Sequence, residues 1–283
     1  MKVIVAEKCG LCHGVRNAIS IAEKILETEK EVYSLGPVIH NRDAVEELAK
    51  RGLKTVESID KITSGTVLIR SHGAAPSEIA ELEHRAVKIV DATCVLVKRV
   101  QQIARQLHED GYNVVIIGDE NHPEVQAVAG CAQSSVVIAD ESDLPKLPKD
   151  SRLGIICQTT KGPDLFAAMI SAIAKWGFSE LKVINTLCKE TIKRQQSAVE
   201  LCKKVDVMFV LGGLQSANTH RLAELCRKYN NQTFHLQNWK EFDKNMVLGK
   251  NVAGVTAGAS TPEFIIDEFV KNLTAFDSRD EMQ

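Results

Sequence analysis

Three of the eight cysteines stand at the same kind of junction in the sequence. Cys12, Cys94 and Cys188 each follow a short apolar run that is typical of a β-strand, and each precedes a segment that we predict to be helical. The positive end of a helix dipole favours the thiolate form of cysteine, which is the form that binds metals. Three thiolates suit either zinc with a water molecule or an iron–sulfur cluster.

The spacing of these cysteines favours the cluster over zinc. Zinc sites usually take ligands from close pairs such as Cys-x-x-Cys, whereas these cysteines lie about 90 residues apart. Iron–sulfur clusters usually have four cysteine ligands, so three cysteines on a [4Fe–4S] cluster would leave one iron open for a substrate.

The other five cysteines are expected to pack as small apolar residues. Cys9 forms a Cys-x-x-Cys pair with Cys12, so a redox dithiol is an alternative. Its place at the end of the first predicted strand favours a packed residue instead. The remaining four are Cys131, Cys157, Cys202 and Cys226.

Polar loops that follow predicted strands contain three histidines, His40, His72 and His122. The last third of the chain supplies hydroxyl and amide side chains in two corresponding loops. These are Gln215, Ser216, Asn218 and Thr219 in one loop, and Ser260 and Thr261 in the other. Imidazoles, hydroxyls, amides and helix N-termini donate hydrogen bonds that suit a phosphate or diphosphate. The sequence therefore predicts a diphosphate pocket, although it has no Walker or Gly-x-Gly-x-x-Gly motif.

One carboxylate, Glu124, follows His122 in the same group of loops. Burial would raise the pKa of this carboxyl and allow it to deliver a proton near pH 7. Thr159 and Thr160 lie in a corresponding loop of the same part of the chain, where they could orient it.

The elements that would position these residues recur three times along the chain. A glycine lies 24 residues after each of the three cysteines and ends a strand-like run: Gly36, Gly118 and Gly212. A further strand-like run in each part leads into a polar loop and a proline, which suits a first helical turn. These prolines are Pro76, Pro163 and Pro262.

This repeated order predicts an α/β fold built of three similar α/β units, each with a parallel sheet covered by helices on both faces. We place the units at residues 1–93, 94–187 and 188–283, with a frayed C-terminal tail at 277–283. Parallel sheets bind ligands beyond the carboxyl ends of their strands, where the polar loops lie. A pseudo-threefold arrangement of the units would bring these loops to one pocket.

Composition narrows the class of protein. The chain has 283 residues, of which 44% are hydrophobic and 25% charged, as in ordinary globular proteins. The net charge of −2 and the 5% of aromatic residues argue against nucleic acid as a partner. No apolar run reaches the length of a membrane span, and the N-terminus does not resemble a signal peptide, so we expect a cytoplasmic protein with reduced thiols.

The motifs together resemble the LytB (IspH) family of 4-hydroxy-3-methylbut-2-enyl diphosphate reductases. They are GLCHGV, LGPVIHN, SHG, DATC, NHPEV, QTT, NTLC, LQSANTHRL and TAGAST, in that order from about residue 9 to residue 265. The resemblance implies a trefoil of three α/β units around a central [4Fe–4S] cluster, with Cys12, Cys94 and Cys188 as its ligands.

The resemblance also implies a reaction, which is the last step of the methylerythritol phosphate route to isoprenoids. The diphosphate substrate loses its hydroxyl and gives isopentenyl and dimethylallyl diphosphate. The hydroxyl would bind the open iron, Glu124 would donate a proton, and ferredoxin or flavodoxin would supply electrons one at a time. The matching substrate-binding positions are His40, His72, His122, Thr159, Thr191, Ser216, Ala217, Asn218 and Ser260.

Four positions depart from the family pattern. Val95 follows the second cysteine where the family commonly has proline, and Ala217 replaces the second of two adjacent serines. Losing one hydrogen bond to a charged group, worth about 1.5–3 kcal/mol, would weaken diphosphate binding unless water or Thr219 compensates. Lys189 and Glu190 also stand where smaller or uncharged residues are more usual.

These departures leave room for other functions. A paralogous reductase or dehydratase with a cluster could act on another substrate. A non-catalytic iron or redox sensor would keep the three cysteines but would not need Glu124. A zinc or dithiol protein would use Cys9 and Cys12.

Overall fold

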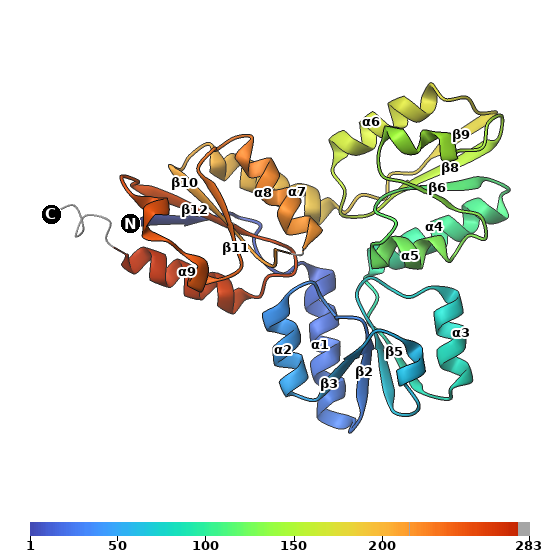
Figure 1. Ribbon diagram of the computed structural model, residues 1–283, viewed down its shortest axis with the longest axis horizontal. Helices are drawn as coiled ribbons and strands as arrows, with labels where there is room; N and C mark the ends of the chain where they lie inside the picture. The colour runs from blue at the N-terminus through green and yellow to red at the C-terminus, as the bar shows by residue number, and fades with distance from the viewer. Residues whose placement is uncertain (215, 277–283) are drawn as a thin grey trace. The chain divides into compact units, whose positions relative to one another are not determined.

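The computed structural model describes residues 1–214 and 216–276 (Figure 1). Gln215 and the tail at 277–283, for which the sequence predicts a polar loop and a frayed end, lie outside the described residues. No helix in the described part of the chain has both the length and the apolar character that a membrane span requires.

The described strands form three parallel sheets of four strands, and all three have the same strand order. The first consists of β3 (Leu53–Val56), β2 (Val32–Leu35), β4 (Thr66–Ile69) and β5 (Lys88–Asp91). The second consists of β7 (Val136–Ile138), β6 (Asn113–Ile117), β8 (Arg152–Cys157) and β9 (Glu180–Val183). The third consists of β11 (Thr233–Leu236), β10 (Val207–Leu211), β12 (Val252–Ala257) and β1 (Lys2–Val5). The predicted α/β fold with three similar parallel sheets is confirmed.

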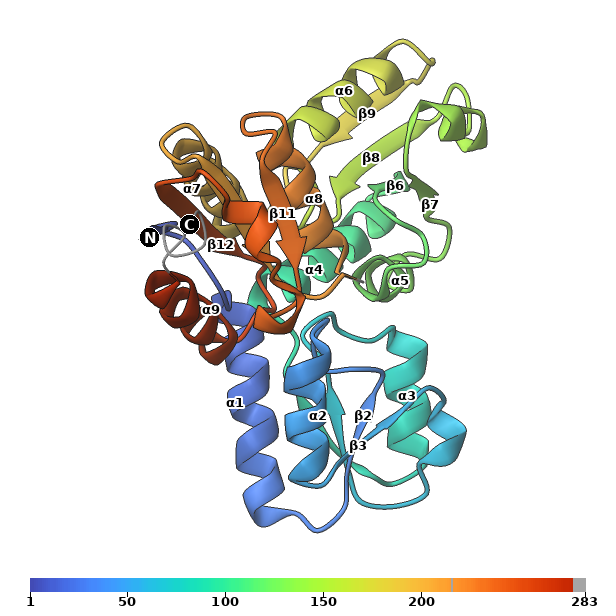
Figure 2. The ribbon, with the colours of Figure 1, turned by 60° about the vertical axis from the view of Figure 1, so that its left-hand side comes forward.

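The N-terminal strand β1 shares a sheet with the last third of the chain. Lys2–Val5 pair in parallel with Val252–Val255 of β12. β1 thus takes the edge position that β5 and β9 take in the other sheets, and Figure 2 shows β9 beside β8 in a turned view. The division at residues 93/94 and 187/188 stays a prediction. It assigns β1 to the first predicted unit, whereas β1 pairs in the sheet of the third.

Helices cover the sheets as an α/β fold requires. One face of the second sheet packs against α4 (Val95–Glu109) and α5 (Pro123–Ala129), and the other against α6 (Pro163–Ala174) and η2 (Glu141–Lys146). One face of the third sheet packs against α7 (Lys189–Cys202) and α8 (Ala217–Arg227). Its other face packs against α9 (Glu263–Ala275), with η3 (Trp239–Glu241) and η4 (Lys244–Val247) nearby.

In the first sheet, Leu82 of α3 (Pro76–His84) and Ile59 of η1 (Ile59–Lys61) pack on Val67 and Ile69 of β4. The remaining helices are α1 (His13–Thr28) and α2 (Arg42–Lys50). Side chains along a strand alternate between the two faces of the sheet, and β10 follows this rule. Phe209 packs in the cluster under α9, whereas Met208 packs in the cluster under α7 and α8.

The chain divides into two compact units that differ from the three sheets. One contains Met1–Val15, Ile39–Glu46 and the described residues from Lys189 onward, and includes the third sheet. The other contains Arg16–Val38 and Glu47–Cys188, and includes the first and second sheets.

Replacing Phe209 with alanine tests the core of the third sheet. Phe209 is fully buried, and its ring centroid lies 5.1 Å from that of Phe269. We expect the Phe209→Ala variant to lose about 3–5 kcal/mol of unfolding free energy, because a large cavity opens. Phe264, which is 55% exposed on α9, is the matched control. Urea unfolding that gave equal losses for both alanine variants would contradict this packing.

Candidate active site

Each cysteine that we predict to bind a cluster lies between the edge strand of a sheet and a helix. Their backbone N–H groups all donate to a carbonyl in the loop after the adjacent strand. The bonds run from Cys94 to Ser71 (3.0 Å), from Cys188 to Thr159 (2.8 Å) and from Cys12 to Ala259 (3.0 Å). Because the sheets share one strand order, the three bonds are equivalent, and each ties a cysteine to a loop that carries a predicted polar residue.

The side chains at these junctions are suited to ligation. All three cysteines are partly exposed. Cys94 is the N-cap residue of α4, and the N–H of Lys98 donates to its carbonyl. Val95, at the position where the family commonly has proline, begins α4 normally and is 68% exposed. The helix therefore forms without the proline.

Cys9 stands before Cys12 at the position where the other two cysteine junctions have a side chain that stabilises the turn. Asp91 and Asn185 stand three residues before Cys94 and Cys188, and each side chain accepts a bond from the N–H two residues further on, at 2.8 and 3.0 Å. Cys9 holds the corresponding place before Cys12 and packs against the core of the third sheet. Burial raises the pKa of its thiol to about 11 despite the nearby Arg194 guanidinium. The prediction of a packed thiol is confirmed, and a thiol that stays protonated is a poor partner for a redox dithiol.

Glu124 is buried beside Thr159. It lies in the first turn of α5 and is only 2% exposed. One carboxylate oxygen accepts from the Thr159 backbone N–H at 2.6 Å, and the other accepts from the Thr159 hydroxyl at 2.8 Å. Thr160, which we also expected to orient Glu124, instead accepts from the Gln158 amide at 3.2 Å.

The environment of Glu124 acts on its pKa in two directions. Burial raises the pKa above its usual range, because a charged carboxylate is poorly solvated there. The two bonds from Thr159 favour the charged form and oppose this rise. Glu124 is therefore an acid that holds its proton more strongly than an exposed glutamate. Once the proton leaves, the two donors of Thr159 already bond the carboxylate.

His122 is held against the start of the same helix. Its Nδ1 accepts from the Glu124 backbone N–H at 3.1 Å, which makes it the N-cap residue of α5. A nitrogen that accepts carries no proton, so the proton of a neutral ring lies on Nε2. The His72 ring lies edge-to-face with it, at 5.4 Å between centroids. Two predicted diphosphate ligands are therefore neighbours within one compact unit.

The other compact unit carries the predicted serine ligands and Thr191. The Ser260 hydroxyl donates to the His40 carbonyl at 3.2 Å, which joins two predicted site residues that are 220 positions apart. Ser216 is the N-cap of α8, whose first turn contains Ala217 and Asn218. Thr191 is buried in the first turn of α7.

Two buried side chains that hold loops near the predicted site residues were not predicted from the sequence. Gln158 is buried between two loops: its oxygen accepts from the Asp119 N–H at 3.1 Å, and its amide donates to Thr160. Arg194 is buried in α7 and donates to the Gly10 carbonyl at 2.9 Å. The QTT motif signals Gln158, whereas nothing in the local sequence distinguishes Arg194 from a surface cation.

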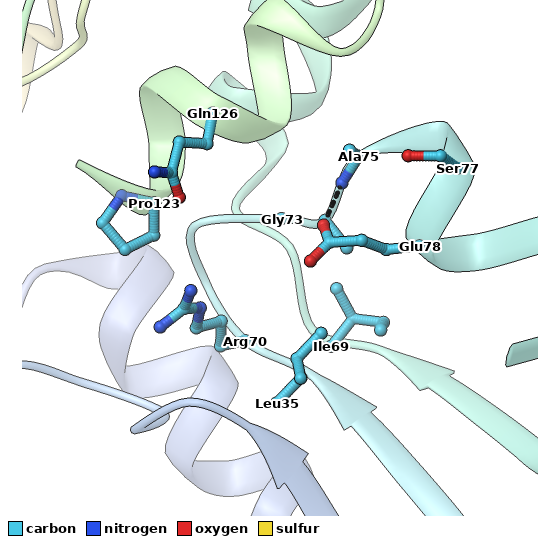
Figure 3. Close-up of a pocket in the computed structure, with 10 residues that line it drawn as sticks. Leu35, Ile69, Arg70, Gly73, Ala75, Ser77, Glu78, Pro123 and Gln126 are labelled. Carbon is cyan, nitrogen blue, oxygen red and sulfur yellow. Dashed lines mark hydrogen bonds between the residues drawn. The ribbon is translucent and has the colours of Figure 1, made fainter. Parts of the chain in front are cut away.

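A separate cavity of about 240 Å³ lies beside the start of α5 (Figure 3). Arg70 reaches into it from the end of β4, while Glu78 bonds the Ala75 N–H at 2.6 Å. None of its ten lining residues is a predicted site residue. Gly36 has a positive φ of 71°, and a Cβ there would overlap the Arg70 guanidinium.

Comparison with known proteins places this chain among iron–sulfur oxidoreductases of one type. A family model described as LytB protein matches residues 3–274. The chain belongs to the LytB family, and membership implies an iron–sulfur cluster.

The curated relatives are named 4-hydroxy-3-methylbut-2-enyl diphosphate reductase. The Trichlorobacter lovleyi protein is 40% identical over 274 residues, which are 96% of this chain and 98% of that protein. The Geobacter sulfurreducens protein is 38% identical over 280 residues, 99% of each chain. These relatives do not favour a paralogue with another substrate.

Two solved structures share the fold. The (E)-4-hydroxy-3-methyl-but-2-enyl diphosphate reductase described as the terminal enzyme of the non-mevalonate pathway is 37% identical, with a TM-score of 0.74. That match covers 98% of this chain and 100% of the other. The E-1-hydroxy-2-methyl-but-2-enyl-4-diphosphate reductase from Plasmodium falciparum is 26% identical, with a TM-score of 0.90 over 96% of this chain and 88% of the other.

Substitutions at Glu124 and Thr159 test the acid. We expect Glu124→Gln to lower kcat by about 10²–10⁴-fold, because it removes a general acid. Thr159→Val removes a bond that favours the carboxylate, so the pKa of Glu124 rises further. Since the protonated form is the active one, the alkaline limb of the pH–rate profile moves to higher pH.

Thr159→Ser keeps the hydroxyl and serves as the matched control, with an unchanged profile. A profile that moved to lower pH in Thr159→Val would contradict the assignment. Stability gives a second measure: a pKa raised by folding means that stability is lost as pH rises through it. The melting temperature of Glu124→Gln should therefore exceed that of the unchanged protein most at alkaline pH.

Proposed function

We propose that this chain is a 4-hydroxy-3-methylbut-2-enyl diphosphate reductase, which forms isopentenyl and dimethylallyl diphosphate in the last step of the methylerythritol phosphate pathway. The observation that carries the proposal is the position of Thr159. Its hydroxyl and N–H bond the buried acid Glu124, and its carbonyl accepts from the N–H of Cys188. One residue thus joins a proton donor to a candidate cluster ligand, which is what a proton-coupled reduction needs.

The cluster that we propose is [4Fe–4S], held by Cys12, Cys94 and Cys188. The donor set fits it, because these are partly exposed cysteines in three equivalent backbone settings. When bound, such a cluster supplies electrons singly and a Lewis-acidic iron. Ferredoxin or flavodoxin is the electron donor that we propose, and the cytoplasm is the location that we expect.

Reductive dehydroxylation consumes two electrons and two protons, breaks a C–O bond, forms a C–H bond and releases water. Glu124 would give a proton to the departing hydroxyl. The two Thr159 bonds would then stabilise the carboxylate that remains. Thr159 would thus both orient the acid and lower the cost of its ionisation in a buried place.

The polar loops would bind the diphosphate end of the substrate. His40, His72, His122, Ser216, Asn218 and Ser260 are the residues that we propose for this role, with Thr191 lining the pocket. Hydroxyl and amide groups bind phosphate oxygens by direct hydrogen bonds and, unlike an isolated buried cation, need no counter-charge when the site is empty.

Serine substitution tests the cluster ligands. We expect Cys94→Ser, purified without oxygen, to lose most of its iron and acid-labile sulfide, because a hydroxyl is a poor ligand for such clusters. Cys131→Ser is the matched control, since Cys131 packs against the core of the second sheet. Iron and sulfide that stay equal in the two variants would rule out Cys94 as a ligand.

Turnover tests the reaction itself. Anaerobic protein with confirmed iron and sulfide is mixed with reduced methyl viologen and 4-hydroxy-3-methylbut-2-enyl diphosphate. We expect rapid bleaching that depends on the substrate, together with isopentenyl and dimethylallyl diphosphate as products. No bleaching from the loaded protein would reject the proposed substrate.

A further inference from the structure

Thr219 is fully buried in the first turn of α8, and its packing allows it little freedom. Its side chain faces two glycines at the carboxyl ends of β10 and β12. A Cβ at Gly258 would overlap the Thr219 hydroxyl, and one at Gly212 would lie 3.1 Å from it. The Thr219 side chain therefore fills the space that Gly258 leaves, and it shares the space at Gly212 with the Thr261 hydroxyl, which would lie 2.5 Å from such a Cβ.

The hydroxyl of Ser216 receives two hydrogen bonds from this one residue. The backbone N–H of Thr219 donates to Ser216 Oγ at 3.3 Å, and the Thr219 hydroxyl donates to the same oxygen at 3.0 Å. A serine hydroxyl has two acceptor positions and one proton. Thr219 occupies both acceptor positions, so the Ser216 proton is directed to an acceptor outside this pair.

We infer that Thr219 is a positioning residue that fixes Ser216 as a hydrogen-bond donor to the substrate diphosphate. The inference rests on the proposed function and deepens it at one subsite. A hydroxyl that is already oriented loses less rotational freedom on binding, which favours affinity. It also cannot turn its proton inward, since its two acceptor positions are held by donors.

This role matters more here because Ala217 supplies no hydroxyl. The family commonly has a second serine at that position, so Ser216 is the only serine left in this turn. Two weakly oriented hydroxyls can share one anion, whereas a single hydroxyl has to be held in place. The buried Thr219 provides that restraint from inside the helix turn.

Thr219→Val tests the inference, because it removes the hydroxyl and nearly preserves the shape. With loaded enzyme, we expect KM for 4-hydroxy-3-methylbut-2-enyl diphosphate to rise about 2- to 13-fold, the range for one lost hydrogen bond, while kcat stays unchanged. Calorimetry should show the same loss of affinity for inorganic diphosphate. Thr219→Ser, which keeps the hydroxyl, should bind as the unchanged protein does.

Ala217→Ser provides the complementary variant. We expect it to recover most of the lost affinity when it is combined with Thr219→Val. An unchanged KM in Thr219→Val would overturn the inference, and so would a fall in kcat at constant KM. If Thr219→Val does not load iron, Thr219→Ala with its affinity for inorganic diphosphate decides in its place. An unchanged protein that binds inorganic diphosphate but does not turn over the substrate would reject the proposed function instead.

Discussion

Three equivalent backbone hydrogen bonds determine where this chain can place its chemistry. Each one ties the N–H of a cysteine to the loop after the neighbouring strand, at Ser71, Thr159 or Ala259. Such a bond forms only if an edge strand lies beside the strand that precedes that loop. The common strand order of the three sheets meets this requirement each time, and it sets every thiol next to a loop with polar side chains.

The polar side chains are in turn held by hydrogen bonds from nearby residues in loops and helix starts. Glu124 is bonded by Thr159, His122 caps the helix that bears Glu124, and Ser216 caps α8. The first turns of helices that follow strands therefore carry the predicted site residues, and N-cap hydrogen bonds orient them. Burial raises the pKa of the Glu124 carboxyl, and a proton donor needs a carboxyl that keeps its proton near neutral pH.

The repeat in the sequence predicted the parallel sheets and the cysteine junctions, because strand, loop and helix signals are local. It could not predict that β1 pairs with β12, since the partner of an edge strand is set by tertiary packing. The contact between Ser260 and His40 is hidden for the same reason. Thr160 was expected to orient Glu124, but the adjacent Gln158 takes its hydroxyl, and such a choice depends on side-chain directions. The predicted role of each site residue stays a prediction.

We propose that three equivalent cysteines hold a [4Fe–4S] cluster and leave one iron for the substrate. Mössbauer spectroscopy of anaerobic protein grown on ⁵⁷Fe distinguishes the irons, with spectra taken before and after addition of 4-hydroxy-3-methylbut-2-enyl diphosphate. We expect one iron in four to differ from the rest and its signal alone to change with the substrate. Four irons that are alike and unaffected by the substrate would contradict it.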